Sequence, residues 1–390
     1  MVDVGLVGAL VASTACSGGD GGGSASSSGA MTTTTMTMTT DAGSTGAAET
    51  GTGTGDAPTT TLGTGDAGTG TGTGTGTEGG ESTSTGDTST GGPPVQDPRY
   101  EALVQYAPRV WMHPEEEYFP SSVEFALPSM TRFLGGDGNY WVGSTVPLDS
   151  PSDDSLPFFK GDLANAPVYA YYADKGNDVV DLVYFFYYPY NRGKEAVDTI
   201  WGNHVGDWEH ITVRLMRGPD ESLTPLQVYL SAHSFGGAYD WAEIEHFEAT
   251  HPVVYSAKGS HGVWSAAGDH VYMSIGEEVF GVCVTIVCID LTDNAGTGTA
   301  WDTWKNVAGF DFVAKEGLAG ATWPVWMSEA FTEPGVQPAN VPGGGAIYRW
   351  GNAEDCSTLG VDISDLIGVC RLEDGPTGPV SKDVWGPDLQ

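Results

Sequence analysis

The sequence is poor in basic residues and has no long apolar run. It holds 15 Lys and Arg against 51 Asp and Glu, a formal net charge of -36 over 390 residues. Nucleic-acid affinity rests on Lys and Arg contacts to phosphates, so this balance argues against a nucleic-acid partner. It suits a solvated protein or one that binds divalent cations, although solubility alone would also explain it.

Several catalytic signatures are also missing. The chain contains no Gly-x-Ser-x-Gly elbow, no Walker A loop, no His-Glu-x-x-His and no dinucleotide fingerprint. These absences remove the common nucleophile, phosphate-loop and zinc-protease motifs. Any chemistry must therefore come from a less common arrangement of residues.

The N-terminal quarter cannot form a hydrophobic core. Residues 17–97 consist mainly of Gly, Ser and Thr with scattered acids, a composition that predicts a disordered linker. An apolar run at 4–12 precedes Ser-Thr-Ala-Cys16, with no Lys or Arg before it; it is far shorter than the roughly 20 residues of a membrane span. Residues 1–16 resemble a bacterial lipoprotein signal peptide, in which Cys16 is lipidated. The alternative is a chance cysteine after an apolar run.

The remaining residues, 98–390, predict one domain rich in strands. The segment from Tyr100 to Val110 favours a short helix ended by Pro108. Many short β-branched and aromatic runs separated by turn residues predict an all-β fold with minor helices, an antiparallel, jelly-roll-like β-sandwich. The predicted strands are 167–173, 179–188, 208–216, 226–232, 252–257, 270–275 and 284–289.

Four cysteines remain besides Cys16. An even number in a chain with an export-like signal indicates two disulfides, and the sequence allows three pairings. The local pairs Cys283–Cys288 and Cys356–Cys370 are the simplest. A zinc site made by all four thiolates is the rival, although neither spacing is that of a zinc knuckle.

The most informative stretch is Gly202–His210, which reads Gly-Asn-His-Val-Gly-Asp-Trp-Glu-His. If it enters a strand, Asp207 and Glu209 begin the same face as the apolar residues that follow. Two buried carboxylates of like charge need a compensating cation or hydrogen bonds. With His204 just upstream, the simplest partner is a divalent ion. A hydrogen-bond network that closes a loop is the alternative.

Histidines cluster in the middle of the chain. All eight lie between His113 and His270. A single histidine in such a setting is more often structural, but several near strand ends and glycine turns can share a site. The candidates that could join His204 are His210, His233, His251 and His261.

A set of ordered motifs resembles the vacuolar protein sorting-associated protein 62 family. These motifs are Tyr106-Ala-Pro, His113-Pro with Tyr118-x-Pro-Ser-Ser, Tyr190-Asn-x-Gly-Lys, Gly202–His210, Ser231-Ala-His-Ser, His251-Pro-Val-Val-Tyr, Gly259-Ser-His and Leu372-Glu-Asp-Gly-Pro. The resemblance covers nearly all of 98–390. The family name implies a link to protein sorting but identifies no chemistry.

A more distant similarity is to the necrosis- and ethylene-inducing-like proteins, secreted β-sandwich cytolysins that bind a divalent cation and sphingolipid glycans. Their heptapeptide Gly-His-Arg-His-Asp-Trp-Glu aligns with 203–209, which implies His204, Asp207 and Glu209 as metal ligands. Their second histidine falls on Gly206. An upstream aspartate of those proteins has only Glu195 and Asp198 near it.

Together these features predict a lipid-anchored protein of the bacterial cell envelope, surface-exposed or secreted, that binds a glycan or glycolipid through a divalent cation. Ligation mainly by oxygen favours calcium, magnesium or manganese over zinc. One alternative is a metal-dependent hydrolase, with Asp207 or Glu209 as general base and His204 or His233 positioning water. Another is a structural surface protein without a ligand.

Overall fold

The structure is a computed structural model. It describes residues 97–134, 140–151, 153–196, 199–233, 236–275, 278–279, 282–283, 289–327, 349–358, 361–362, 370–373 and 375–390. The predicted signal peptide with Cys16 and the predicted linker up to residue 96 lie outside the described residues, as do Asp198 and Cys288. The division into signal, linker and domain therefore stays a prediction.

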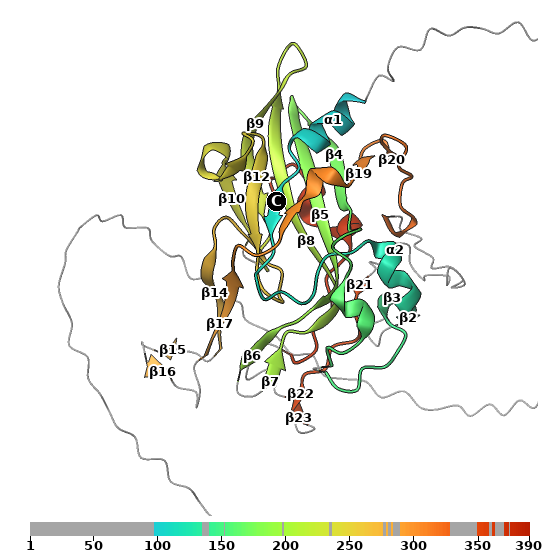
Figure 1. Cartoon of the computed structure of the whole chain (residues 1–390), viewed down its shortest axis with the longest axis vertical. Coiled ribbons are helices and arrows are strands. Elements are labelled where there is room, and N and C mark those ends of the chain that lie inside the picture. Colours follow the sequence, from blue (N-terminus) through green and yellow to red (C-terminus); the bar gives the residue numbers. More distant parts are fainter. Residues whose placement is uncertain are drawn as a thin grey trace, which may run out of the picture. The chain divides into compact units, whose positions relative to one another are not determined.

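A seven-stranded sheet forms the centre of the domain (Figure 1), in the order β10-β9-β8-β5-β4-β19-β20. Its strands are β4 Val168–Gly176, β5 Val179–Asn191, β8 His204–Arg217, β9 Leu223–Leu230, β10 Gly237–Asp240, β19 Val307–Asp311 and β20 Glu316–Gly317. Beyond its first residue, β5 is buried along its whole length. Its unbroken apolar and aromatic run therefore reflects a strand covered on both faces.

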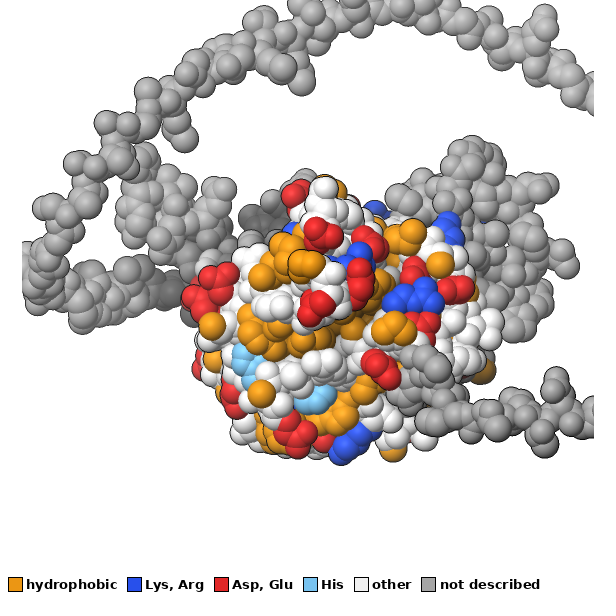
Figure 2. Space-filling model, turned by 90° about the horizontal axis from the view of Figure 1, so that it is seen from above, with side chains coloured by type: hydrophobic (Ala, Val, Ile, Leu, Met, Phe, Trp, Pro, Cys, Tyr) orange, Lys and Arg blue, Asp and Glu red, His pale blue; other side chains and the backbone are white. Residues whose placement is uncertain are grey.

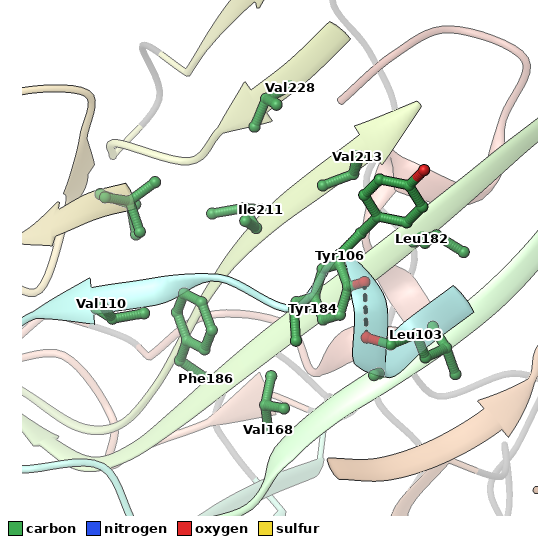
Figure 3. Close-up of a cluster of buried hydrophobic side chains, with 14 of the residues drawn as sticks. Leu103, Tyr106, Val110, Val168, Leu182, Tyr184, Phe186, Ile211, Val213 and Val228 are labelled. Carbon is green, nitrogen blue, oxygen red and sulfur yellow. Dashed lines mark hydrogen bonds between the residues drawn. The ribbon is translucent and has the colours of Figure 1, made fainter. Parts of the chain in front are cut away.

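A second sheet covers one face of the central sheet. Its strands are β1 Arg109–Trp111, β11 His246–Phe247, β12 His251–Ser256, β13 Val263–Trp264 and β18 Ala300–Asp302, in the order β11-β12-β1-β18 with β13 on β12. Figure 3 shows the core between the layers, where Phe186 and Ile211 of the central sheet pack with Val110 of β1. Helix α1, Pro98–Gln105, joins this core, and Tyr184 donates to the Leu103 carbonyl over 3.0 Å.

The opposite face of the central sheet carries a second, strongly aromatic core. It is covered by helix α2 Val123–Ala126 and by a small sheet of β2 Met130–Leu134, β3 Tyr140–Ser144 and β21 Arg349–Trp350. Trp208 of β8 is 1% exposed there, 5.5 Å from Trp350 and 5.2 Å from Trp326 between ring centroids. The central sheet is thus buried on both sides, which fixes its side chains firmly.

Four short strand pairs complete the described elements. They are β6 Lys194–Ala196 with β7 Thr199–Trp201, β14 Gly268–Ile275 with β17 Ile289–Ala295, β15 Glu278–Val279 with β16 Val282–Cys283, and β22 Ser357–Thr358 with β23 Val361–Asp362. Short 3₁₀ turns connect several of the larger elements. Residues 379–390 contain two such turns, at Pro379–Ser381 and Asp383–Trp385.

The predicted all-β class with minor helices is confirmed. The alternation in β8 is also as predicted, since Ile211, Val213 and Leu215 enter one core and Trp208 enters the other. The sheets are mixed rather than purely antiparallel, because β1 with β12, β4 with β19 and β3 with β21 are parallel pairs. Side-chain alternation reports which faces are buried and carries no information about the direction of a distant partner strand.

The structure also bears on the predicted disulfides and on the surface of the domain. Cys356 is bonded to Cys370, the pairing that the sequence favours, whereas the Cys283–Cys288 pair lies partly outside the described residues. Within the described part of the chain, no helix is long and apolar enough to cross a membrane. Figure 2 shows acidic, basic and hydrophobic side chains interspersed on one face of the molecule.

Candidate functional site

A pocket of about 640 Å³ lies beside the first half of β8. Strand β5 pairs with β8 from His204 onward, but β9 pairs with it only from Ile211 to Arg217. Among the described residues, the edge of β8 from His204 to His210 therefore has no strand neighbour on one side, and residues from both faces of β8 reach one cavity. His204, Asp207, Glu209, His210, Ser231 and His233 are among the residues that line it.

The orientation of His204 depends on a glycine two residues later. Gly206 has φ +73°, and a Cβ there would lie 3.2 Å from the Trp350 Cβ, so both conformation and space favour glycine. His204 Nδ1 lies 3.0 Å from the Gly206 carbonyl oxygen. Since a carbonyl only accepts, Nδ1 carries the proton and Nε2 keeps its lone pair. Burial lowers the pKa of His204, which favours this neutral, ligand-competent form.

Asp207 is held by a second histidine. It is 4% exposed, and its Oδ2 lies 3.1 Å from His261 Nδ1. His261 Nε2 lies 3.0 Å from the Tyr118 carbonyl oxygen, and its ring stacks on Tyr188 at 3.7 Å. Burial works to raise the pKa of Asp207, but the hydrogen bond with His261 outweighs it and lowers that pKa. Asp207 is therefore the ionised carboxylate of the pocket.

Glu209 has the opposite character. Burial, followed by the charge of Asp207, raises its pKa well above the ordinary value. Ser231 Oγ donates to Glu209 Oε2 and accepts from the His210 backbone N–H over 2.8 Å. Two carboxylates separated by one residue thus favour different protonation states because of their surroundings. The other carboxylate oxygen of Asp207 and the other carboxylate oxygen of Glu209 have no hydrogen-bond partner among the described residues.

The three predicted metal ligands share the pocket but are not gathered around one point. Among the described residues, the side chains whose ligand atoms lie within 4.8 Å of one another are Glu354, Cys356 and Cys370, and two of these form the disulfide. His204, Asp207 and Glu209 are not such a group. They supply a free imidazole nitrogen and two unpaired carboxylate oxygens, which is the donor chemistry of a cation site, but ligation would need them to draw closer.

The far wall of the pocket is organised by Asp293 of β17, which is fully buried. It accepts hydrogen bonds from Ser260 Oγ, from His233 Nε2 over 2.9 Å and from Trp264 Nε1 over 2.9 Å. Lys194 Nζ lies 3.2 Å away. Burial opposes ionisation, but these donors and charges hold the pKa of Asp293 far below its usual range. His233 also stacks on Tyr272 at 3.9 Å, so its ring is fixed from two sides.

His210 differs from the other histidines of the pocket. It is 6% exposed, and neither ring nitrogen has a hydrogen-bond partner. Burial, with a smaller contribution from the charge of Lys382, lowers its pKa to about 3, so the ring is neutral. Lys382 also lines the pocket and makes no ion pair with any described residue.

The other predicted neighbours are spread more widely. His251 lies outside the pocket, where its Nδ1 contacts the Ala107 carbonyl over 2.7 Å and its ring stacks on Trp304 at 3.9 Å. Glu195 is exposed on β6 and borders a second cavity of about 430 Å³. Asp198 lies outside the described residues.

Sequence reasoning missed several residues that build the site. Asp293, Lys382 and Tyr272 come from segments far from Gly202–His210 and have no recognisable motif around them. Ser231 lies in the Ser-Ala-His-Ser motif, in which His233 alone is a candidate from the sequence. The sequence offered one signal for Asp293. An aspartate is rarely buried, and this one lies in a strand just before Asn294 and a glycine-rich turn.

The fold and site define a β-rich domain whose central sheet ends in a polar, histidine-lined pocket. Residues 127–285 match the family described as vacuolar protein sorting-associated protein 62. In Saccharomyces cerevisiae, vacuolar protein sorting-associated protein 62 is 30% identical over 296 residues, 69% of this chain and 55% of the relative. The putative vacuolar protein sorting-associated protein TDA6 is 31% identical over 277 residues, 57% of this chain and 56% of the relative. The resemblance to this family is therefore confirmed, and the chain spans about half the length of these relatives.

Solved structures similar to this chain include proteins of the predicted necrosis-inducing type. A non-toxic HaNLP3 protein is 16% identical with a TM-score of 0.31, covering 62% of this chain and 84% of that one. NLPPya in complex with mannosamine is 18% identical with a TM-score of 0.29, covering 44% and 68%. Likeness at this level supports no argument about function.

Two predictions are wrong. The relatives are yeast proteins named for vacuolar sorting, so a surface-anchored bacterial lipoprotein and a location in the bacterial envelope are both overturned. A short apolar run followed by a cysteine is too little chemistry to specify lipidation.

Proposed function

We propose that this chain is a ligand-binding protein of the vacuolar sorting type, and that the pocket beside β8 binds a hydroxyl-rich ligand of the sugar class. A divalent cation held by His204, Asp207 and Glu209 assists this binding. By likeness to the yeast relatives, its place of action is the endomembrane system.

The observation that carries the proposal is that several polar groups without hydrogen-bond partners face one pocket that is also lined by aromatic residues. His204 Nε2 and one oxygen each of Asp207 and Glu209 lack partners, while Tyr229 and Tyr272 supply flat apolar walls. Ligand pockets commonly combine apolar walls with a few placed polar groups. Sugars match such a lining because they carry an apolar ring face and several hydroxyl groups.

The cation is proposed because the negative charges of Asp207 and Glu209 are not fully compensated by the protein's own groups. Asp207 is compensated by His261, but its remaining charge helps to raise the pKa of Glu209. A cation between them would replace the proton on Glu209 and draw His204 Nε2 inward. Oxygen-rich ligation favours calcium, magnesium or manganese.

Calorimetric titration of the chain with mannose, glucose and glucosamine, with calcium or after EDTA treatment, tests the proposal. We expect sugar binding that weakens on chelation, and Asp207→Asn should abolish the cation effect. His246→Ala, which removes a histidine outside the pocket, is the matched control and should bind normally. If neither a divalent ion nor any of these sugars binds the wild-type chain, the proposed function is wrong.

A further inference from the structure

His210 occupies an unfavourable position for a polar side chain. Both of its ring nitrogens are closed off from solvent and unpaired, although the residue lines the pocket. A buried polar atom without a partner destabilises the folded protein, so native proteins rarely keep one. The adjacent Trp208 Nε1 is likewise buried and unpaired. Three polar atoms of two neighbouring residues therefore lack partners at one wall of the pocket.

The ring of His210 is held in a fixed orientation. It lies between Phe185, 5.3 Å away, and Tyr229, 5.6 Å away, measured between ring centroids. A neutral imidazole held in this way presents one N–H donor and one lone-pair acceptor in defined directions. That pair of functions matches hydroxyl groups, which both donate and accept.

Residues 379–390, here called the C-terminal strap, lie against the same face of β8. Thr212 Oγ1 donates to the Gln390 carbonyl, and Arg214 donates to the Pro387 carbonyl over 3.0 Å. His210 precedes these two residues on the same strand face but receives no hydrogen bond from the strap, although Lys382 and Gln390 border the same pocket. The strap thus pairs with Thr212 and Arg214 and leaves His210 unpaired.

We propose that His210 determines the ligand specificity of the pocket, by hydrogen-bonding hydroxyl groups of the bound sugar once the strap shifts away from it. This inference rests on the proposed function. The strap is held by side-chain contacts to its backbone, among them those of Lys175 to the Val384 and Gly386 carbonyls, by burial of Val384 in the aromatic core and by the stacking of Trp385 on Phe312 at 3.6 Å. Among the described residues it makes no strand pairing with β8. A shift of the strap opens the ring nitrogens of His210 to the pocket that the residue already lines, and the bound ligand then supplies the missing partners.

The test exploits the opposite effects that His210→Phe should have on stability and on binding. Phenylalanine fills the space between Phe185 and Tyr229 but removes both unpaired nitrogens. We expect the melting temperature to rise by about 2–4 °C, the shift typical of one relieved polar group in a domain of this size. We expect affinity for glucose or mannose to fall about tenfold or more.

The matched control is His246→Phe. His246 Nε2 is also buried and unpaired, but the residue does not line the pocket. This variant should gain similar stability and bind sugar as the wild type does. His210→Gln, which keeps one donor and one acceptor, should retain most of the affinity.

Deoxy sugars identify the contact directly. Among 2-, 3-, 4- and 6-deoxyglucose, one analogue should bind the wild type most weakly because it lacks the hydroxyl that contacts His210. Relative to glucose, that analogue should lose no affinity for the His210→Phe variant, as a double-mutant cycle requires. If the wild type binds sugar and His210→Phe binds equally well, this inference fails and the proposed function stands. A lower melting temperature for His210→Phe would also overturn it, since the nitrogens would then be paired in the free protein. If the wild type binds no sugar, the proposed function itself fails.

Discussion

His261 is positioned by two acceptors, with Nδ1 3.1 Å from Asp207 Oδ2 and Nε2 3.0 Å from the Tyr118 carbonyl oxygen. The Asp207–His261 pair is therefore a buried contact behind the pocket, held from both sides of the imidazole ring. It ties the loop before α2 to the start of β8, and so fixes the direction of Asp207.

Replacing His261 with Leu should destabilise the fold strongly. Removing the side chain that contacts the buried Asp207 carboxylate leaves that charge uncompensated, which costs about 3–5 kcal/mol in the free energy of unfolding. Urea denaturation followed by tryptophan fluorescence measures this loss. His270→Leu is the control, since His270 stacks on Trp264 and contacts the Ala266 carbonyl near the surface, with no buried charge beside it, and it should cost less than about 1 kcal/mol. Equal losses for the two variants would show that the Asp207–His261 pair has no special role.

Asp293→Asn should be destabilising in a pH-dependent way. The carboxylate is fully buried with His233, Ser260, Trp264 and Lys194 around it, and the change should cost about 3–5 kcal/mol at neutral pH. Since the folded-state pKa of Asp293 is depressed, its contribution is fully present above the unfolded-state pKa of about 3.8 and is lost as the pH falls through the folded-state pKa. The stability difference between wild type and variant should therefore shrink as the pH is lowered below about 4. A difference that stays constant from pH 7 down to pH 3 would contradict this account.

Cys356→Ser should lower stability by about 3 kcal/mol on the chain-entropy estimate, because the disulfide to Cys370 spans 14 positions. Denaturation curves with and without a reducing agent measure this. Reduction should destabilise the wild type by a similar amount and leave the variant unchanged. Cys370 also accepts a hydrogen bond from Gly202 through its carbonyl over 2.8 Å, so the loop before His204 should loosen when the link is broken. Wild-type stability that does not respond to reduction would rule the disulfide out.

Gly206→Ala should disturb the pocket more than the fold. The position has φ +73°, and the added Cβ would lie 3.2 Å from the Trp350 Cβ, so backbone strain should cost about 1–2 kcal/mol. The larger effect should fall on His204, whose Nδ1 bonds the Gly206 carbonyl. Histidine NMR signals should show His204 shifted while His251 is unchanged. Gly176→Ala is the control, since it also has positive φ but open space around it and no contact to the pocket.

The sequence by itself determined the main strands, among them β4, β5, β8 and β9 of the central sheet and β12, and one face of the site. Alternation in β8 placed Asp207 and Glu209 on the face of Ile211 and Val213, and the unbroken apolar run of β5 indicated burial on both sides, because strand side chains alternate with a period of two. The ordered motifs around His204 also indicated the sorting family, which the yeast relatives confirm.

Tertiary structure decided the rest. The pocket exists because β9 stops pairing at Ile211. Its walls come in part from Tyr272 and Lys382, with Asp293 behind them holding His233 and Ser260, and all three lie more than 60 residues beyond Gly202–His210 in the chain. Local periodicity cannot report contacts between distant segments, because it records only which side of a strand is buried. For the same reason the sequence could not distinguish His261, which holds Asp207, from His251, which stacks on Trp304 in another part of the fold.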